Sequence, residues 1–183
     1  MHKLYCGGTF GFDFLENGYR QKAATDYRAV LLGSADLLLE KHEYIPLSDN
    51  LRYMGPFYFE TKGMIDRDIV NAEVQMIKEC TNAIFLLDNA ACPGTIAELT
   101  LASTLGKTVE IFYIKYSDDE ETESELHSPC WFPILMSSIM NNSTHITGCF
   151  DYNDAVAKIC DYVKLYTERR CSYSITFSHS LAR

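Results

Sequence analysis

Positive charge is scarce in this sequence of 183 residues. Sixteen lysines and arginines stand against 25 aspartates and glutamates, which gives a formal net charge of −9 and a sequence pI near 5.0. A chain of this charge has little attraction for nucleic acid backbones or anionic membranes. The composition therefore predicts partners that are small molecules or further copies of the chain, with no nucleic acid polymer and no membrane among them.

Long apolar runs are also missing. No segment approaches the roughly 20 apolar residues that span a bilayer, and the first five residues do not resemble an apolar signal region. The seven cysteines include no Cys-x-x-Cys pair, and their odd number suits a reducing compartment better than a disulfide framework. These observations predict a cytoplasmic protein whose cysteines are mostly core thiols.

Metal-ligand patterns are equally sparse. His127 and Cys130 have an H-x-x-C spacing, but two ligands without others nearby do not make a zinc site. The residues that are abundant belong to a globular chain, with 47% hydrophobic and 13% aromatic residues. We expect a single domain over residues 1–168, and a tail over residues 169–183 that adds an edge strand or packs against another subunit.

Apolar patterns of strand and helix type alternate along the chain. Short apolar runs predict strands, and apolar residues at helical spacing between them predict helices. The predicted strands are Lys3–Cys6, Tyr44–Leu47, Ala83–Leu87, Val109–Ile114 and His145–Phe150. The predicted helices are Gly18–Leu32, Asp36–Glu40, Asp66–Cys80, Thr95 to about Leu105, Pro133–Met140 and Asp151–Glu168. This order predicts an α/β fold, Rossmann-like (flavodoxin-like), with an open, mostly parallel five-stranded sheet flanked by helices.

Glu98 stands out on the helix after the third predicted strand. Leu99, Ala102 and Leu105 form the inward stripe of that helix, and Glu98 projects between Ala102 and Leu105. A buried carboxylate needs a partner or a cavity. We expect Glu98 to lie in the first helical turn and to stay ionised there. A first-turn glutamate that only complements the helix dipole would show the same pattern.

A second inward carboxylate is Glu73 on the preceding helix. It lies four residues after Ile69 and four before Ile77, both of which belong to the apolar stripe. Paired inward carboxylates are a common arrangement for nucleophilic and acid–base catalysis at a sugar carbon. A structural salt bridge from Glu73 to Arg52 or Arg67 is the competing interpretation.

Two loops have the composition of a pocket wall. Gly7 and Gly8 directly follow the first strand, where paired glycines let a ligand approach the backbone. Residues Arg52 to Glu60 are rich in aromatic side chains around Gly-Pro, which predicts a loop that stacks a flat ligand or simply packs onto the core.

Three motifs together resemble the nucleoside 2-deoxyribosyltransferase family over roughly residues 3–163. They are Tyr5-Cys6-Gly7-Gly8-Thr9-Phe10 after the first strand, Glu73 in the middle helix, and Gly94-Thr95-x-x-Glu98 after the central strand. The resemblance implies that Glu98 is the nucleophile and that Glu73 is the acidic residue of the preceding helix. It also implies that Tyr5, Gly7 and Gly8 line the site.

The match departs from the family at one position. Family members commonly carry an aspartate just before Gly-Thr, where it contacts a sugar hydroxyl, whereas this chain has Cys92 and Pro93 there. Asp88 could substitute from the end of the strand. Asn141 or Asn142 matches an asparagine that some members contribute to a neighbouring subunit's site. We expect a homo-oligomer built from dimers, with the Arg52 to Glu60 loop or Asn141 and Asn142 near a neighbour's pocket.

The predicted activity is N-glycosyl transfer or hydrolysis on a nucleoside or nucleotide, with an acceptor base in the case of transfer. A sugar ester on Glu98 would divide the displacement into two steps. Phe10, Phe57 and Tyr58 could stack on the base, and the reaction requires no metal or redox cofactor. A nucleotide-binding or sensing module without turnover, and a related phosphoribohydrolase-like enzyme or nucleotide N-glycosidase, are the alternatives.

Overall fold

The computed structural model describes residues 1–9, 23–57, 66–88, 93–115, 126, 128 and 130–168. Within them a six-stranded sheet has the order β2-β3-β1-β4-β5-β6. The strands are β1 (His2–Gly8), β2 (Ile45–Ser48), β3 (Leu51–Gly55), β4 (Asn82–Leu87), β5 (Thr108–Ile114) and β6 (Thr144–Cys149). All neighbours pair in parallel except β2 and β3. Without β2, this is the flavodoxin-like strand order, so the predicted mostly parallel α/β sheet is confirmed.

The sheet has six strands rather than the predicted five. The additional strand is β3, whose residues 52–55 belong to the segment predicted as an aromatic loop. Leu51 and Tyr53 alternate inward along β3, and both are buried. A tight turn at residues 49–50 joins β2 to β3, which then runs beside β1. The strand ends at Gly55, where a glycine followed by proline stops the ladder. Of the aromatic residues in the predicted loop, Tyr53 therefore packs as a strand residue, and Phe57 follows the strand.

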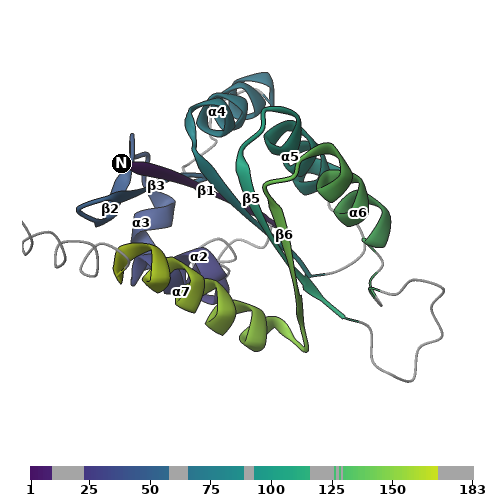
Figure 1. Ribbon diagram of the computed structural model, residues 1–183. Helices are drawn as coiled ribbons and strands as arrows, with labels where there is room; N and C mark the ends of the chain where they lie inside the picture. Colours follow the sequence, from purple (N-terminus) through teal and green to yellow (C-terminus); the bar gives the residue numbers. More distant parts are fainter. Residues whose placement is uncertain are drawn as a thin grey trace, which may run out of the picture.

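Helices cover both faces of the sheet, as Figure 1 shows. One layer contains α4 (Asp66–Glu79), α5 (Pro93–Thr104) and α6 (Trp131–Met140). The other contains α2 (Tyr27–Leu32), α3 (Asp36–Leu39) and α7 (Tyr152–Glu168). Two apolar clusters correspond to the two layers: Tyr5 and Phe85 pack with Leu99 of α5, whereas Cys6 and Ile84 pack on the α2 and α7 side.

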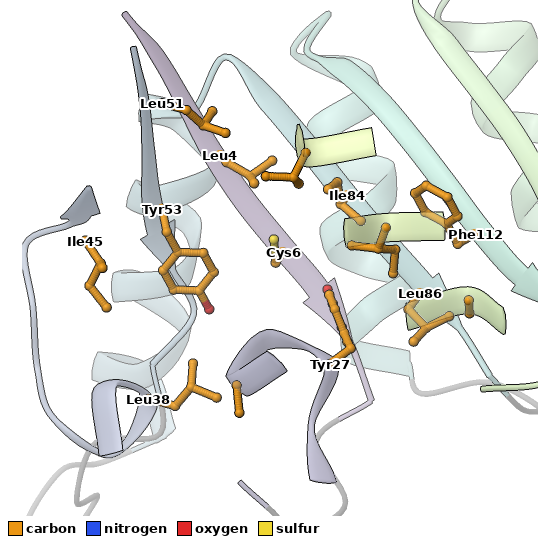
Figure 2. Packing of buried hydrophobic residues seen from close by; sticks show 14 of the residues in the cluster. Leu4, Cys6, Tyr27, Leu38, Ile45, Leu51, Tyr53, Ile84, Leu86 and Phe112 are labelled. Atoms are coloured by element: carbon orange, nitrogen blue, oxygen red, sulfur yellow. The ribbon is translucent and has the colours of Figure 1, made fainter. Parts of the chain in front are cut away.

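Strand alternation decides which cluster each residue joins. Tyr5 and Cys6 are neighbours in β1, and their side chains point to opposite faces because the strand period is two. Figure 2 shows the α2 and α7 side, where Leu4 and Cys6 of β1 lie beside Ile84 and Leu86 of β4. The opposite face of the same two strands therefore carries the candidate site residues Tyr5 and Gly7.

Where they are described, the predicted C-terminal ends of the helices agree with the structure to within one residue. Gly33 and Gly106 have φ values of 75° and 66°, the left-handed conformation that ends a helix. Leu105 was predicted to point inward, but it is 43% exposed because α5 ends at Thr104. Residues 18–22, the acidic stretch 117–125 and the tail 169–183 lie outside the described residues.

No helix in the described ranges is long and apolar enough to cross a membrane. The five cysteines in those ranges, Cys6, Cys80, Cys130, Cys149 and Cys160, are all free thiols, and the first four are buried.

Candidate active site

The candidate site lies where β1 and β4 end, at the edge of the sheet to which the parallel strands run. After β1 the next described helix is α2, and after β4 it is α5. These two helices lie on opposite faces of the sheet. Such a switch point between two parallel strands is where open α/β sheets bind ligands. The Thr9 hydroxyl donates a 2.9 Å hydrogen bond to Asp88, which joins the two strand ends.

Gly7 brings the backbone of β1 directly against α5. A Cβ atom placed on Gly7 would lie 2.4 Å from the Phe85 ring and 3.0 Å from Oε2 of Glu98. Both distances are shorter than ordinary contacts, so a side chain at position 7 would displace the ring or the carboxylate. Glycine is therefore needed at this position for close packing, and the Glu98 carboxylate lies beside the β1 backbone.

Glu98 is the sixth residue of α5, which begins at Pro93. The prediction that it lies in the first turn is therefore wrong, and the first turn contains no acidic residue. Because the influence of the helix dipole falls off within the first turn, the dipole does little to keep Glu98 ionised. Thr95, by contrast, lies buried in that first turn, and Gly94 is exposed beside it.

The pKa of Glu98 is raised to about 7. Burial is the main cause, and the negative charge of Glu73 adds to it. The nearby Tyr5 hydroxyl and the charge of Arg28 oppose the shift. A substantial fraction of the Glu98 carboxyl groups is therefore protonated at neutral pH, in contrast to the ionised group expected from the sequence.

Glu73 on α4 is half-buried and shares this environment. Burial raises its pKa, and Arg28 lowers it. Its charge acts on both Glu98 and Tyr5, so the three groups are electrostatically coupled. Among the described residues Glu73 has no ion-pair partner, so the competing interpretation of a salt bridge to Arg52 or Arg67 is not supported. The guanidinium of Arg52 lies 4.0 Å from the ring centre of Tyr44.

Tyr5 is fully buried on the same face of β1. Its pKa is raised well above the ordinary value, first by burial and then by the charges of Glu98 and Glu73. Its hydroxyl has no partner of regular hydrogen-bond geometry in the described ranges, yet it lies close enough to Glu98 to lower that pKa. The raised pKa keeps the phenol neutral beside the two carboxyl groups.

Arg28 is a functional candidate that sequence reasoning missed. It is completely buried, and its Nε and Nη2 each donate a 2.7 Å hydrogen bond to Asp26. Its Nη1 donates to the Cys6 carbonyl at 3.1 Å, while the neighbouring Tyr27 hydroxyl donates to the Gly7 carbonyl at 2.8 Å. In the sequence, the only signal was an aspartate and an arginine two residues apart at the start of an apolar helix.

Not all predicted site residues come together. Phe57 is buried in the core on the α2 and α7 side, where its ring meets that of Tyr53 edge-on at 5.3 Å between centroids. Asn142 is exposed between α6 and β6, at the edge where the parallel strands begin and thus opposite to Glu98 within one chain. Its contribution to a neighbour's site stays a prediction, while Phe10 and Tyr58 lie outside the described residues.

Gly8 and Asp88 complete the strand ends. A Cβ on Gly8 would lie 3.2 Å from the Leu86 carbonyl and 3.3 Å from the Tyr27 ring, so this glycine is also closely packed. In the part of the chain that the structure describes, no three His, Cys, Asp or Glu side chains are grouped as metal ligands.

The chain is thus an open α/β protein with two coupled carboxyl groups at the switch point of its sheet. No protein-family model and no curated protein sequence matches it. Among solved structures, the CMP N-glycosidase BcmB of Clostridium botulinum has a TM-score of 0.48 and 15% identity, covering 87% of this chain and 98% of its own. A probable GTP-binding protein engB has a TM-score of 0.46 and 11% identity, covering 92% and 99%. With TM-scores below 0.5, neither likeness assigns a function to this chain.

Proposed function

We propose that this protein catalyses N-glycosyl transfer or hydrolysis on a nucleoside or nucleotide through a covalent glycosyl ester of Glu98. The observation that carries the proposal is the largely buried Glu98 carboxyl group, held against the Gly7 backbone at the switch point of the sheet. A carboxylate kept away from water loses its hydration shell and becomes available as a nucleophile.

In the first step, an oxygen of ionised Glu98 attacks C1′ of the sugar. The bond from C1′ to the base nitrogen breaks, its electron pair leaves with the base, and a proton neutralises the departing nitrogen. In the second step, water or the nitrogen of an acceptor base attacks C1′ and releases the carboxylate. Two successive displacements retain the configuration at C1′.

Glu73 is suited to the proton transfers of both steps. Its raised pKa keeps a larger fraction protonated near neutral pH than a solvent-exposed glutamate has. As an acid it would supply the proton to the departing base, and as a base it would then take one from the incoming nucleophile. A carboxyl group with a raised pKa beside a second carboxyl group is the pattern of environment-tuned acid–base pairs.

The remaining polar groups would fix the orientation of the substrate. The Tyr5 hydroxyl lies close enough to Glu98 to lower its pKa, so it favours the ionised carboxylate. Asp88 lies at the end of β4, where its carboxylate could accept a hydrogen bond from a sugar hydroxyl as well as from Thr9. Gly94 and Thr95 lie in the first turn of α5, where backbone amides are free to bind an oxygen of the substrate.

The test is to incubate the protein with nucleosides and nucleotides, each with and without an acceptor base, and to compare Glu98→Gln with a control. We expect wild type to release or exchange the base, and Glu98→Gln to lose about 10³-fold or more in kcat/KM. Acid quenching followed by mass spectrometry should show the sugar attached to Glu98 in wild type alone. Glu79→Gln, an exposed glutamate at the end of α4, is the matched control.

Full activity in Glu98→Gln would refute the nucleophile assignment. Tight binding of a nucleotide with no conversion by wild type would instead identify a binding or sensing module. Exchange with an added base would distinguish a transferase from a hydrolase, which releases the base without requiring an acceptor.

A further inference from the structure

Helix α6 carries apolar side chains on its outer face as well as on its inner one. The inner face is attached to α5 through a hydrogen bond between Ser103 and Ser137, and Ile134 is buried in the core. The outer face consists of Trp131, Phe132, Leu135, Ile139 and Met140, which are 46%, 61%, 39%, 81% and 47% exposed. Exposed side chains of this size on one short helix need an explanation, since isolated ones are ordinary but a contiguous group marks an interaction surface.

The spacing of these side chains makes one continuous stripe. Phe132 and Leu135 are three residues apart, and Leu135 and Ile139 are four apart, so they lie on the same side of the helix. Leu135 is in the middle, with aromatic side chains one turn before it and aliphatic ones one turn after. The stripe therefore has ends of different shape and a central residue.

The segment around α6 is free of charge. Residues 128–144 contain no Asp, Glu, Lys or Arg, although the whole chain carries a formal charge of −9. Two copies of so acidic a chain repel each other unless they meet where the charge is absent. A basic partner, by contrast, would be attracted to acidic surfaces elsewhere, so the uncharged stripe favours a second copy of this chain.

The exposed area suits a contact between two such copies. The five side chains leave roughly 500 Å² of apolar surface accessible, at the upper end of what a monomer exposes in one patch. A stable interface buries about 800 Å² on each partner, so this stripe would supply more than half of that area and a polar rim the rest. Figure 1 shows α6 at the outer end of the layer formed by α4, α5 and α6, beside β6, the last strand of the sheet.

We propose that the outer face of α6 is a two-fold contact between two copies of this chain. A two-fold axis near Leu135 packs the stripes antiparallel, so that Phe132 of one copy meets Ile139 of the other. The contact goes beyond the proposed activity and does not depend on it. The surface that binds to it is the same uncharged, apolar face of α6 in the second copy.

The test measures mass by sedimentation over a range of protein concentration. Wild type should have about twice the 20.8 kDa of one chain, and Ile139→Glu should shift the dissociation constant upward by about 100-fold or more because it places a charge in an apolar contact. Because Ile139 is 81% exposed, this change leaves the core intact, which circular dichroism and thermal unfolding can verify. Leu165→Glu on α7 is the control, since Leu165 is 51% exposed on the other face of the sheet.

A charge exchange tests the antiparallel geometry. Phe132→Lys and Ile139→Glu should each be monomeric alone, and mixing them should restore a dimer that contains one copy of each. A monomeric wild type at high micromolar concentration would overturn the proposal. So would a wild-type dimer that survives Ile139→Glu or is broken equally by Leu165→Glu, because the contact would then lie elsewhere.

Discussion

At the scale of single residues, Glu98 shows how burial and a like charge together change one functional group. Its pKa is about 7, with burial as the larger cause and Glu73 as the second. The Tyr5 hydroxyl and Arg28 limit the shift, so a fraction of the group stays ionised at neutral pH. A nucleophile with these properties is most reactive above neutral pH, where the carboxylate form predominates.

Glu98→Gln should stabilise the fold at alkaline pH. The folded-state pKa lies above the ordinary value of 4.5, so the penalty for ionising Glu98 is absent below about pH 4.5, grows up to pH 7 and is constant above it. Removing the charge should raise the free energy of unfolding by up to about 3 kcal/mol at pH 8. Urea denaturation at pH 4.5 and pH 8 measures this, and an equal effect of the mutation at both pH values would contradict it.

Glu73→Gln should lower the pKa of Glu98, because it removes the neighbouring negative charge that raises it. A ¹³C NMR titration of the glutamate carboxyl groups follows this directly, without depending on turnover. In wild type, kcat/KM should rise with pH as Glu98 ionises, with a midpoint near 7, and should fall again as Glu73 loses the proton that it donates to the departing base. Glu79→Gln, on the same helix, should leave the Glu98 titration unchanged, and an unaltered midpoint in Glu73→Gln would show that the two carboxyl groups are not coupled.

At the scale of elements, α2 fixes the end of β1. β3 ends at Gly55, which pairs with Tyr5, and beyond this point the carbonyl groups of Cys6 and Gly7 accept hydrogen bonds from Arg28 and Tyr27. Since the Glu98 carboxylate lies against Gly7, α2 holds the backbone on which the candidate site rests. A short helix on one face of the sheet thus supports a carboxyl group on the other.

Arg28→Met should destabilise the fold by about 3–5 kcal/mol, because Asp26 loses its bidentate partner in a buried position. Adding Asp26→Asn should recover part of this loss, since asparagine is neutral and can still accept the hydrogen bond from the Arg28 backbone amide. Chemical denaturation of the two single mutants and the double mutant gives the coupling energy. Strictly additive effects would show that the two side chains do not stabilise each other.

At the scale of the whole molecule, the net charge of −9 opposes any contact between copies. An uncharged stripe on α6 reduces this repulsion locally but does not remove the long-range component. Salt screens that component, because the Debye length falls from about 30 Å at 0.01 M to about 3 Å at 1 M.

Raising the salt concentration should therefore strengthen the α6 contact. We expect the dimer dissociation constant to fall by about tenfold between 20 mM and 500 mM sodium chloride, as screening weakens the repulsion between two acidic chains. Sedimentation equilibrium measures it, with Ile139→Glu expected to stay monomeric throughout. A dissociation constant that rises with salt would point to an interface held by ion pairs.

Local patterns predicted much of this fold. Short apolar runs marked five of the six strands, and glycines marked the ends of α2 and α5, because periodicity and capping depend on residues close together in the chain. The same patterns singled out Glu98 and Glu73, since a carboxylate within an apolar stripe is visible without a structure. Their catalytic roles remain predictions.

Contacts between distant segments decided the rest. Leu51–Gly55 is a strand because β1 and β2 lie on either side of it, and Phe57 is a core residue because Tyr53 packs against it. The Glu98 pKa depends on Glu73 and Tyr5, which come from other elements, and Arg28 reaches β1 only in the folded chain. The sequence alone determined which residues are polar among apolar neighbours. Their pairing, burial and charge state depend on the tertiary structure, because electrostatic and packing energies depend on distances in space.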